Sequence, residues 1–428
     1  MSVATSITLN NLELTRFFFA ITSLLVSAHF FGYLFHKYKL PKVTGEIFGG
    51  FLLGPTVLGH FLPDIHNWLF NAFAEEGKLI SIIYWFGLII LMFISGFEIQ
   101  KRFGREDKKI ITAVILGSTI IPLIAGWAIP YIYDFSPYMG VKNNALALQI
   151  VIAIAIAVTS IPVISKIFID LNVINTYFAK VVLSAATIHD VILWIALAVA
   201  TGLVSATTIS LSGIVATVLI TVIFFILALT LAPRVIKLSN TMKYNLLIKS
   251  SVVGYALFIC LLFSALASIL NVNIVFGAFL AGIVIGLMPS EKFEKEKAHI
   301  KEIGLAFFIP VYFSIVGLKL DLVHSFDAGF FLLFLLFSSA FEIAGTMLAA
   351  RVIKIDWLSS FNLGVAMNAR GGPGIILATV AFDLGIINEK FFVTLVLTAI
   401  VTSLAAGSWF KYVLSKGREL LKAALGNE

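Results

Sequence analysis

Hydrophobic residues run along this chain in long blocks that short polar stretches separate. A helix that crosses a bilayer needs about 20 apolar residues. Applied along the 428 residues, this window predicts thirteen spanning segments, near residues 13–36, 43–61, 79–98, 110–132, 145–170, 176–203, 209–233, 247–269, 272–288, 303–318, 328–350, 358–383 and 391–410. Strands of a membrane barrel have about ten residues and alternate in polarity. The pattern therefore predicts an all-α polytopic membrane protein.

The composition agrees with a lipid environment. The chain is 60% hydrophobic and 12% charged, whereas soluble domains carry about a quarter charged residues. This excludes a soluble enzyme, a disordered protein and a nucleic-acid-binding domain. The single cysteine, Cys260, excludes an intramolecular disulfide and a multi-cysteine metal site. We expect no cofactor, and we expect the first block to be a retained span rather than a signal peptide.

Basic residues indicate the orientation of the chain, because short cytoplasmic loops retain Lys and Arg. With thirteen spans, 24 of the 30 Lys and Arg residues fall on the side of the C-terminus. The opposite side holds five, which are Arg16, Lys78, Lys142, Lys319 and Lys390. The remaining residue, Arg370, lies inside a span. We therefore expect a plasma or inner membrane protein with its N-terminus outside and its C-terminus in the cytoplasm.

The thirteen spans divide into two groups of six that face opposite ways, as in the inverted repeats of many transporters. Within a single transmembrane domain 1–428, the expected parts are repeat one at 13–203, a linker helix at 209–233, repeat two at 247–410 and a tail at 411–428. Matching glycines support the repeat, namely Gly45, Gly50 and Gly54 against Gly277, Gly282 and Gly286. The alternative is that small residues at this spacing are ordinary packing positions.

Two spans carry sequences that a regular helix tolerates poorly. Span 145–170 contains Thr159, Ser160 and Pro162, and span 358–383 contains the stretch 370–374, Arg-Gly-Gly-Pro-Gly. Proline removes a backbone donor and kinks a helix. Paired interruptions in two halves of a membrane protein point to a transport site. A plain proline kink is the alternative explanation for the first span.

Three charges lie deep in predicted spans, where each costs about 2.5–3.5 kcal/mol on insertion scales. They are Asp190, Glu342 and Arg370. A buried carboxylate such as Asp190 can hold either a proton or a cation, which is what ion exchange requires. The alternative is that Asp190 is permanently paired with Arg370 or Lys180.

The neighbouring candidates have supporting roles. His189 precedes Asp190 and is either a titrating group or a packing residue. Arg370 keeps its charge at all working pH values and suits a fixed counter-charge. Glu342 is the expected partner of Arg370, and the alternative is that it carries a second proton.

Four stretches resemble the monovalent cation:proton antiporter-2 family of sodium/proton and potassium/proton exchangers. They are Gly45-Glu46-Ile47 through Leu53-Gly54-Pro55, Ala157 through Val163, the acidic position His189-Asp190, and Met367-Asn368-Ala369-Arg370-Gly371. Phe307 through Leu318 also looks like the family's tenth span. The resemblance extends over essentially the whole chain.

This resemblance implies a homodimer in which a core bundle moves against a scaffold, with two broken helices crossing beside the ion-binding aspartate. By position that aspartate is Asp190, and Thr159 and Ser160 would help to coordinate the ion. His189 stands where many electrogenic members have a second acidic residue, and this favours electroneutral exchange. Glu342 stands near a position where many members have a lysine.

We therefore expect a secondary transporter, not an enzyme, that exchanges Na⁺ or K⁺ for H⁺ and serves pH homeostasis. One alternative is a proton-coupled transporter of a small organic anion that uses Arg370 and the broken helices. The other is a membrane sensor without transport activity, which would need a partner-facing soluble domain.

Overall fold

The computed structural model describes residues 9–38, 40–98, 108–205, 211–241, 245–288 and 291–422. Ten helices in these ranges are long and apolar enough to cross a membrane, and the bent pair α18 (Trp357–Met367) and α19 (Gly371–Asp383) makes eleven. The predicted all-α polytopic class is confirmed. Lys39, Lys243 and the basic residues within 99–107, which entered the orientation argument, lie outside the described residues.

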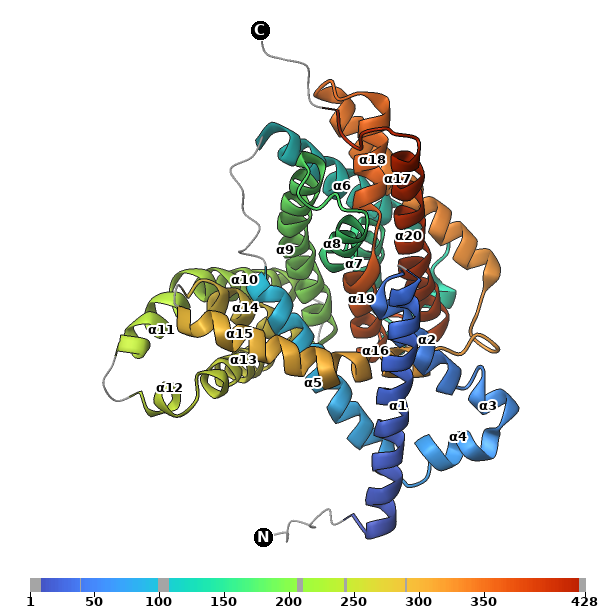
Figure 1. Ribbon diagram of the computed structural model, residues 1–428, viewed down its shortest axis with the longest axis vertical. Coiled ribbons are helices and arrows are strands. Elements are labelled where there is room, and N and C mark those ends of the chain that lie inside the picture. Colours follow the sequence, from blue (N-terminus) through green and yellow to red (C-terminus); the bar gives the residue numbers. More distant parts are fainter. Residues whose placement is uncertain are drawn as a thin grey trace. The chain divides into compact units, whose positions relative to one another are not determined.

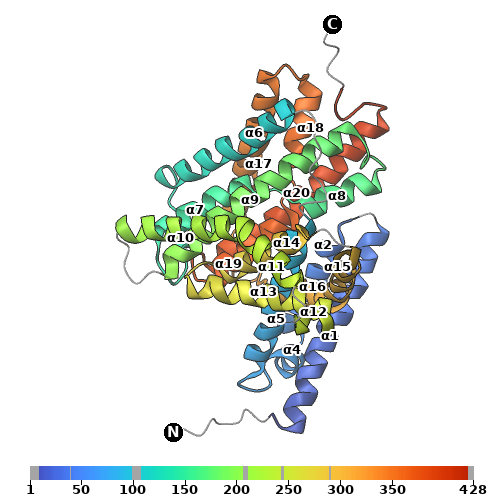
Figure 2. The same cartoon turned by 90° about the vertical axis from the view of Figure 1, so that its left-hand side faces the viewer.

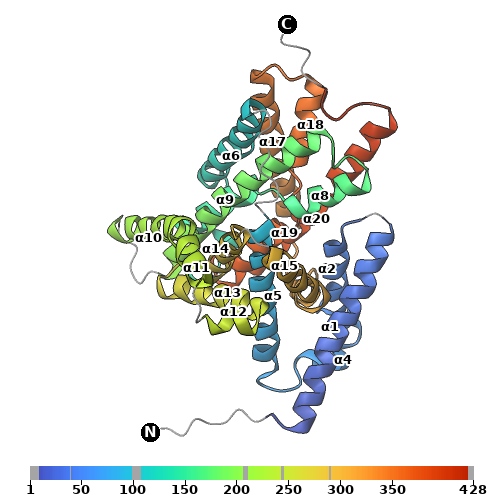
Figure 3. The same ribbon diagram turned by 60° about the vertical axis from the view of Figure 1, so that its left-hand side comes forward.

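The chain forms two compact units, and the first comprises Met1–Leu91 and Lys301–His324. Its elements are α1 (Asn11–Lys37), α2 (Lys42–Leu53), α3 (Leu58–Phe61), α4 (Pro63–Phe70), the first part of α5 (Glu76–Glu98), the π-helical turn Gly304–Phe308 and α16 (Ile309–Leu318). Helix α2 lies beside α1 (Figure 3) and also packs on α16. A Cβ atom at Gly50 would lie 1.7 Å from the Ser314 carbonyl oxygen, so this close approach of α2 to α16 requires glycine.

The second unit comprises Met92–Ile300 and Ser325–Glu428. Besides the end of α5, its helices are α6 (Lys108–Ala128), α7 (Ala145–Ala157), α8 (Ile161–Asp170), α9 (Tyr177–Ser205), α10 (Leu211–Thr230), α11 (Ala232–Thr241), α12 (Leu246–Ser250), α13 (Val252–Ile269), α14 (Ile274–Gly286), most of α15 (Glu291–Ile303), α17 (Ala328–Val352), α18, α19 and α20 (Glu389–Ser415). Helix α6 packs on α7, α9 and α17, and Figure 2 shows α6 beside α9.

Two of the thirteen predicted spans are occupied by short helices. Helix α2 has 12 residues and α14 has 13, fewer than the about 20 that a full crossing needs. The count of thirteen therefore stays a prediction. Each unit also contains segments from both expected repeats, so the units are not the repeats, and the division of the domain into repeats likewise stays a prediction.

Helices α17 and α20 of the second unit begin at a common aromatic cluster. The Tyr138 ring stacks on Phe330 with centroids 3.6 Å apart, and its hydroxyl donates to the Asp327 carboxylate at 3.1 Å. Phe391, in the first turn of α20, lies 5.3 Å from both Phe330 and Phe334. The two helices therefore start close together, and they pack on each other (Figure 1).

Candidate ion-binding site

The first interruption of a span separates α7 from α8. Helix α7 ends at Ala157, and the backbone is extended at Val158 and Ser160 before α8 begins at Ile161. Ser160 is the N-cap of α8, because its hydroxyl accepts from the Val163 N–H at 3.4 Å. Pro162 occupies the first turn, where its missing N–H needs no partner. The sequence therefore produces two half-helices instead of a kink, and the alternative of a plain proline kink is excluded.

The second interruption separates α18 from α19, which meet at a bend of 40°. Gly371 has φ +38°, a left-handed conformation that favours glycine. A Cβ atom there would lie 2.3 Å from Val163 Cγ2 and 2.6 Å from Ser160 Oγ. The glycine stretch therefore allows the two interruptions to touch each other.

Each interruption supplies a side chain that bonds to the carbonyl end of the other span. Thr159 Oγ1 donates to the carbonyl of Met367, the last residue of α18, at 2.5 Å. Arg370 donates from Nε to the Ala155 carbonyl at 3.2 Å and from Nη2 to the Ile156 carbonyl at 3.1 Å. The last carbonyls of a helix lack partners within the helix. The two half-helices α7 and α18 are thus capped reciprocally.

Helix α20 holds the second interruption in place, a role that the sequence analysis missed. The Ser403 hydroxyl accepts from the Gly371 N–H at 3.1 Å, and the Thr402 hydroxyl accepts from the Arg370 N–H at 3.5 Å. The available signal was a row of threonines four residues apart, Thr394, Thr398 and Thr402, in an otherwise apolar helix. Such a row indicates a helix face that packs on exposed backbone.

Asp190 lies on α9 beside both interruptions and is 7% exposed. It lines a small cavity together with Val158 of the first interruption, Pro373 of the second and Trp194 of α9. The volume of this cavity is about 10 Å³, which is room for about one water molecule. This space is too small for an organic anion, and apart from Asp190 its lining is apolar, without Thr159 and Ser160.

The electrostatics of this region suit a cation that one carboxylate neutralises. Thr159 and Ser160 are fully buried and place hydroxyl oxygens at the first interruption. The carbonyl ends of α7 and α18 carry partial negative charge, and the N-terminal ends of α8 and α19 carry partial positive charge. Discontinuous helices in transporters use these ends to coordinate ions and substrates.

Arg370 and Lys180 are the cations considered above as permanent partners of Asp190. Arg370 Nε and Nη2 bond to carbonyls of α7, and Nη1 has no hydrogen-bond partner. Lys180 is on the same helix, ten residues before Asp190, which separates the two backbone positions by about 15 Å along the axis. The observed hydrogen bonds of Arg370 thus go to α7 and not to Asp190.

The remaining candidates are buried but not joined to Asp190 by hydrogen bonds. His189 is fully buried, and neither ring nitrogen makes a hydrogen bond of standard geometry. Glu342 is fully buried as well, and no hydrogen-bond partner lies near either carboxylate oxygen. The direct contact expected between Glu342 and Arg370 is therefore not formed, because two nitrogens of Arg370 are engaged by α7.

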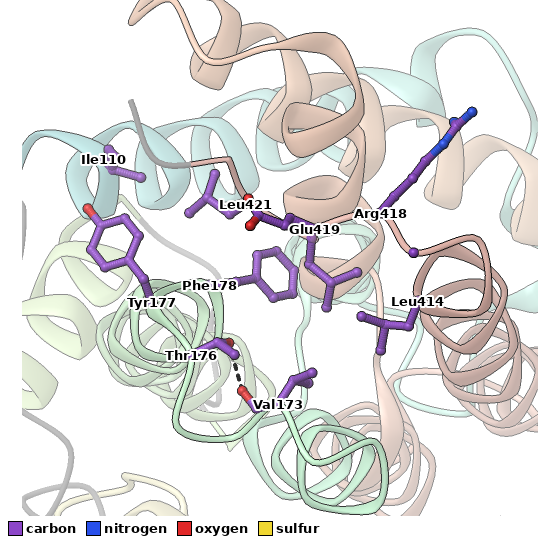
Figure 4. A pocket seen from close by; sticks show the side chains of 11 residues that line it. Ile110, Val173, Thr176, Tyr177, Phe178, Leu414, Arg418, Glu419 and Leu421 are labelled. Atoms are coloured by element: carbon purple, nitrogen blue, oxygen red, sulfur yellow. Dashed lines mark hydrogen bonds between the residues drawn. The ribbon is translucent and has the colours of Figure 1, made fainter. Parts of the chain in front are cut away.

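A larger cavity of about 760 Å³ lies elsewhere in the second unit. It is bounded by the start of α6, the loop between α8 and α9, and residues 414–421. In Figure 4 the side chains of Ile110, Phe178 and Leu421 project into one space, and the Arg418 guanidinium extends away from it. None of the deep charges lines this cavity, so its size does not make it the ion site.

Comparison with known proteins connects this arrangement to ion exchange. The family described as "Sodium/hydrogen exchanger, transmembrane" matches residues 25–416. The chain is 26% identical to the Na(+)/H(+)-K(+) antiporter GerN of Bacillus cereus, over 96% of this chain and 99% of that protein. It is 24% identical to the Na(+)/H(+) antiporter NhaS4 of Synechocystis, over 88% of this chain and 92% of that protein.

Two further matches extend the comparison. The K(+)/H(+) antiporter 1 of Saccharomyces cerevisiae is 28% identical over 91% of this chain, which spans 45% of that longer protein. Among solved structures, the sodium proton antiporter MjNhaP1 of Methanocaldococcus jannaschii at pH 8 superposes with a TM-score of 0.66. That match covers 94% of this chain and 99% of the other at 14% identity, so it shows a common fold.

Proposed function

The chain belongs to the family of transmembrane sodium/hydrogen exchangers, and from this premise we propose that Asp190 is the site where a monovalent cation and a proton compete. The protein is a transporter that exchanges a monovalent cation for protons, and not an enzyme. The observation that carries the proposal is the position of Asp190 in a cavity of about 10 Å³ bounded by both interruptions. The organic-anion alternative has no support.

Competition follows from the chemistry of one buried carboxylate. Asp190 is 7% exposed, and an ionised carboxylate away from water needs a compensating positive charge. A bound proton or a bound cation supplies it, and a cavity with room for about one water does not admit a hydrated ion as well. Thr159 and Ser160, with carbonyls of the interruptions, complete the oxygen set for Na⁺ or K⁺. Alternating exposure of this site gives one-for-one, electroneutral exchange.

The test is cation-dependent proton flux in everted membrane vesicles. Adding Na⁺, K⁺ or Li⁺ to a preformed pH gradient should collapse it with the unmodified protein and leave it intact with Asp190→Asn. The matched control is Asp134→Asn, because Asp134 is exposed and its carboxylate accepts from the Ser136 N–H in a loop. Flux that survives in Asp190→Asn would contradict the assignment. A membrane potential that leaves the rate unchanged would support electroneutrality.

We also propose the orientation with the N-terminus outside and the C-terminus in the cytoplasm of the plasma or inner membrane. The support is the distribution of Lys and Arg among the predicted loops. Because Cys260 is the only cysteine and is 1% exposed, a single cysteine placed in residues 411–422 of a Cys260→Ser protein can be labelled unambiguously. In intact cells a membrane-impermeant maleimide should fail to label it, and labelling would reverse the orientation.

The homodimer and a role in pH homeostasis are proposed on the family resemblance. Light scattering of the purified protein in detergent should give a mass of two 46.7 kDa chains after subtraction of the detergent. A mass of one chain would contradict the dimer. Growth of an exchanger-deficient strain at alkaline pH and high Na⁺ should depend on Asp190 if the protein serves pH homeostasis.

A further inference from the structure

Helix α17 buries one stripe of side chains, and the middle of that stripe is polar. At intervals of four residues the buried positions are Phe330, Phe334, Ser338, Glu342, Thr346 and Ala350. Only 28% of the helix is buried, so most of its remaining surface faces outward. Burying a polar stripe on an otherwise apolar membrane helix costs free energy, so such a stripe indicates a functional position.

Glu342 is the one ionisable residue of this stripe, and it lacks partners. It is fully buried, and neither carboxylate oxygen has a hydrogen-bond partner in the part of the chain that the structure describes. The Thr346 hydroxyl, one turn away, also has none. Ser338 does not help, because its hydroxyl donates to the Leu335 carbonyl at 3.3 Å. In this arrangement an ionised Glu342 would be a buried and unsolvated anion, which is far less stable than the neutral acid.

Helix α20 also packs on α17. The Phe334 ring of α17 and the Phe391 ring of α20 are 5.3 Å apart. Farther along α20, the hydroxyls of Thr394 and Thr398 are fully buried and have no hydrogen-bond partner among the described residues. The polar groups that α20 buries there are thus uncharged.

In the elements that pack on α17, Arg370 is the charged residue that lies away from the helix ends. Those elements are α6, α7, α18 and α20, with the interruption after α18. Helices α7 and α18 contain no Asp, Glu, Lys, Arg or His, and the others carry charges only near their ends, at Lys108, Lys109, Glu389, Lys390 and Lys411. Within α17 the nearest charge is Arg351, nine residues on. Arg370 makes no hydrogen bond to Glu342, because its Nε and Nη2 bond to carbonyls of α7.

Building on the proposed exchange at Asp190, we propose that Glu342 is a positioning residue that binds and releases a proton and thereby controls where Arg370 is bonded. With Glu342 protonated, Arg370 caps the Ala155 and Ile156 carbonyls, as observed. When Glu342 releases its proton to water, the carboxylate attracts the guanidinium, whose Nη1 has no partner. The cap on α7 then weakens within one turn of Thr159.

Both consequences favour a cation at Asp190. The ionised Glu342 adds a negative charge to the same unit, and the released carbonyls of α7 become available near the first interruption. Coupling between two sites commonly changes affinity by about 5- to 150-fold. The KM for Na⁺ should therefore fall about tenfold more on alkalinisation than competition with one proton explains, with the exchange stoichiometry unchanged.

The experiment compares Glu342→Gln and Glu342→Asp with the unmodified exchanger in proteoliposomes, from acid to alkaline pH, with Na⁺ as the probe. The amide mimics protonated Glu342, so Glu342→Gln should match the unmodified protein at acid pH. At alkaline pH its KM for Na⁺ should fall only as much as competition with one proton explains, without the additional fall of about tenfold. Glu342→Asp should retain that fall at a shifted pH. Ser338→Ala, one turn away in the same stripe, is the control and should keep the normal profile.

Infrared difference spectra provide a readout that does not depend on transport. A protonated carboxylic acid has a carbonyl stretch that disappears on ionisation, and this band should be lost in Glu342→Gln but retained in Asp190→Asn. An unchanged KM profile in Glu342→Gln, or equal impairment at every pH, would overturn the inference. Absence of exchange by the unmodified protein would instead refute the function of the chain as a whole.

Discussion

The two interrupted spans of the second unit look alike but are held by different chemistry. In the first, Thr159 and Ser160 supply neutral hydroxyls, and Ser160 caps the following half-helix itself. In the second, Arg370 supplies a charge, Gly371 supplies a left-handed backbone, and the cap comes from Ser403 of another helix. The half-helix after the first interruption is thus capped by its own residue, whereas the one after the second is capped by another helix.

In the proposed exchange at Asp190, this difference separates two tasks. Neutral hydroxyl oxygens can coordinate a cation without adding a charge to the site, so the first interruption suits a cation that Asp190 neutralises. A buried guanidinium would repel a cation unless it is engaged elsewhere, and here it is engaged by two carbonyls of α7. The charged interruption therefore stabilises the neutral one. Substitutions at the two interruptions should therefore differ in effect, and the largest should be at Arg370.

Replacing Arg370 by methionine should have the largest effect. It removes two charge-assisted hydrogen bonds and leaves the Ala155 and Ile156 carbonyls unpaired, at a cost of about 3–6 kcal/mol. We expect a much lower thermal midpoint in detergent and loss of exchange. Arg370→Lys, which keeps the charge but not the fork of donors, should be intermediate. A stable and active Arg370→Met protein would show that the reciprocal capping is unnecessary.

Replacing Gly371 by alanine should cost about 1–3 kcal/mol, because φ +38° is strained for a residue with a Cβ atom. The added atom would also lie 2.3 Å from Val163 Cγ2 and push the two interruptions apart. The neighbouring Gly372→Ala is the matched control, because a Cβ atom there meets nothing within 4 Å. Thermal unfolding of the two variants measures the difference. Equal destabilisation would mean that the interruptions are not in contact.

The sequence could predict that spans are interrupted, but not how the ends are satisfied. Hydropathy located Asp190, and the proline and glycine residues located both interruptions, because these signals are local. The predicted hydrogen-bond partner of Arg370 was wrong. A carboxylate was expected, whereas Arg370 donates to two backbone carbonyls in the structure. Every residue has a carbonyl, so composition and spacing cannot mark the ones that are exposed. Ser403 was missed for the same reason, since its partner is a backbone N–H.

Replacing Thr159 by valine should cost about 1–2 kcal/mol, because the Met367 carbonyl loses its hydroxyl donor in a buried site. If Thr159 also coordinates the ion, the KM for the cation should rise in the valine variant, and exchange should still be measurable at high cation concentration. Thr159→Ser restores the hydroxyl and should recover both stability and KM. A valine variant with reduced stability but unchanged KM would limit Thr159 to capping. Thermal unfolding and vesicle exchange distinguish these outcomes.

The smallest expected effect concerns the outer ends of the two interrupted spans. Asn144 caps α7, accepting from the Ala147 N–H, whereas Asp356 caps α18, accepting from the Leu358 and Ser359 N–H groups. Partial burial alone would raise the pKa of Asp356, but hydrogen bonds from Ser359 and the charge of Lys422 lower it below its usual value of 3.8.

Because the pKa of Asp356 is lower in the folded protein, its stabilising contribution is complete above pH 4 and disappears as the pH falls through the folded value. Asp356→Asn keeps a good N-cap, since Asn and Asp are equivalent at that position. This variant should lose only the part of the stabilisation that depends on pH. Asp356→Ala should cost about 1 kcal/mol at neutral pH. Thermal unfolding near pH 3 and pH 7 measures both. The reverse exchange, Asn144→Asp, should not transfer acid sensitivity to α7. Asn144 is buried and its Nδ2 also donates to the Leu203 carbonyl at 3.3 Å. An ionised carboxylate cannot donate to that carbonyl, so this variant should be destabilised more at pH 7 than at pH 3, where the protonated acid can donate.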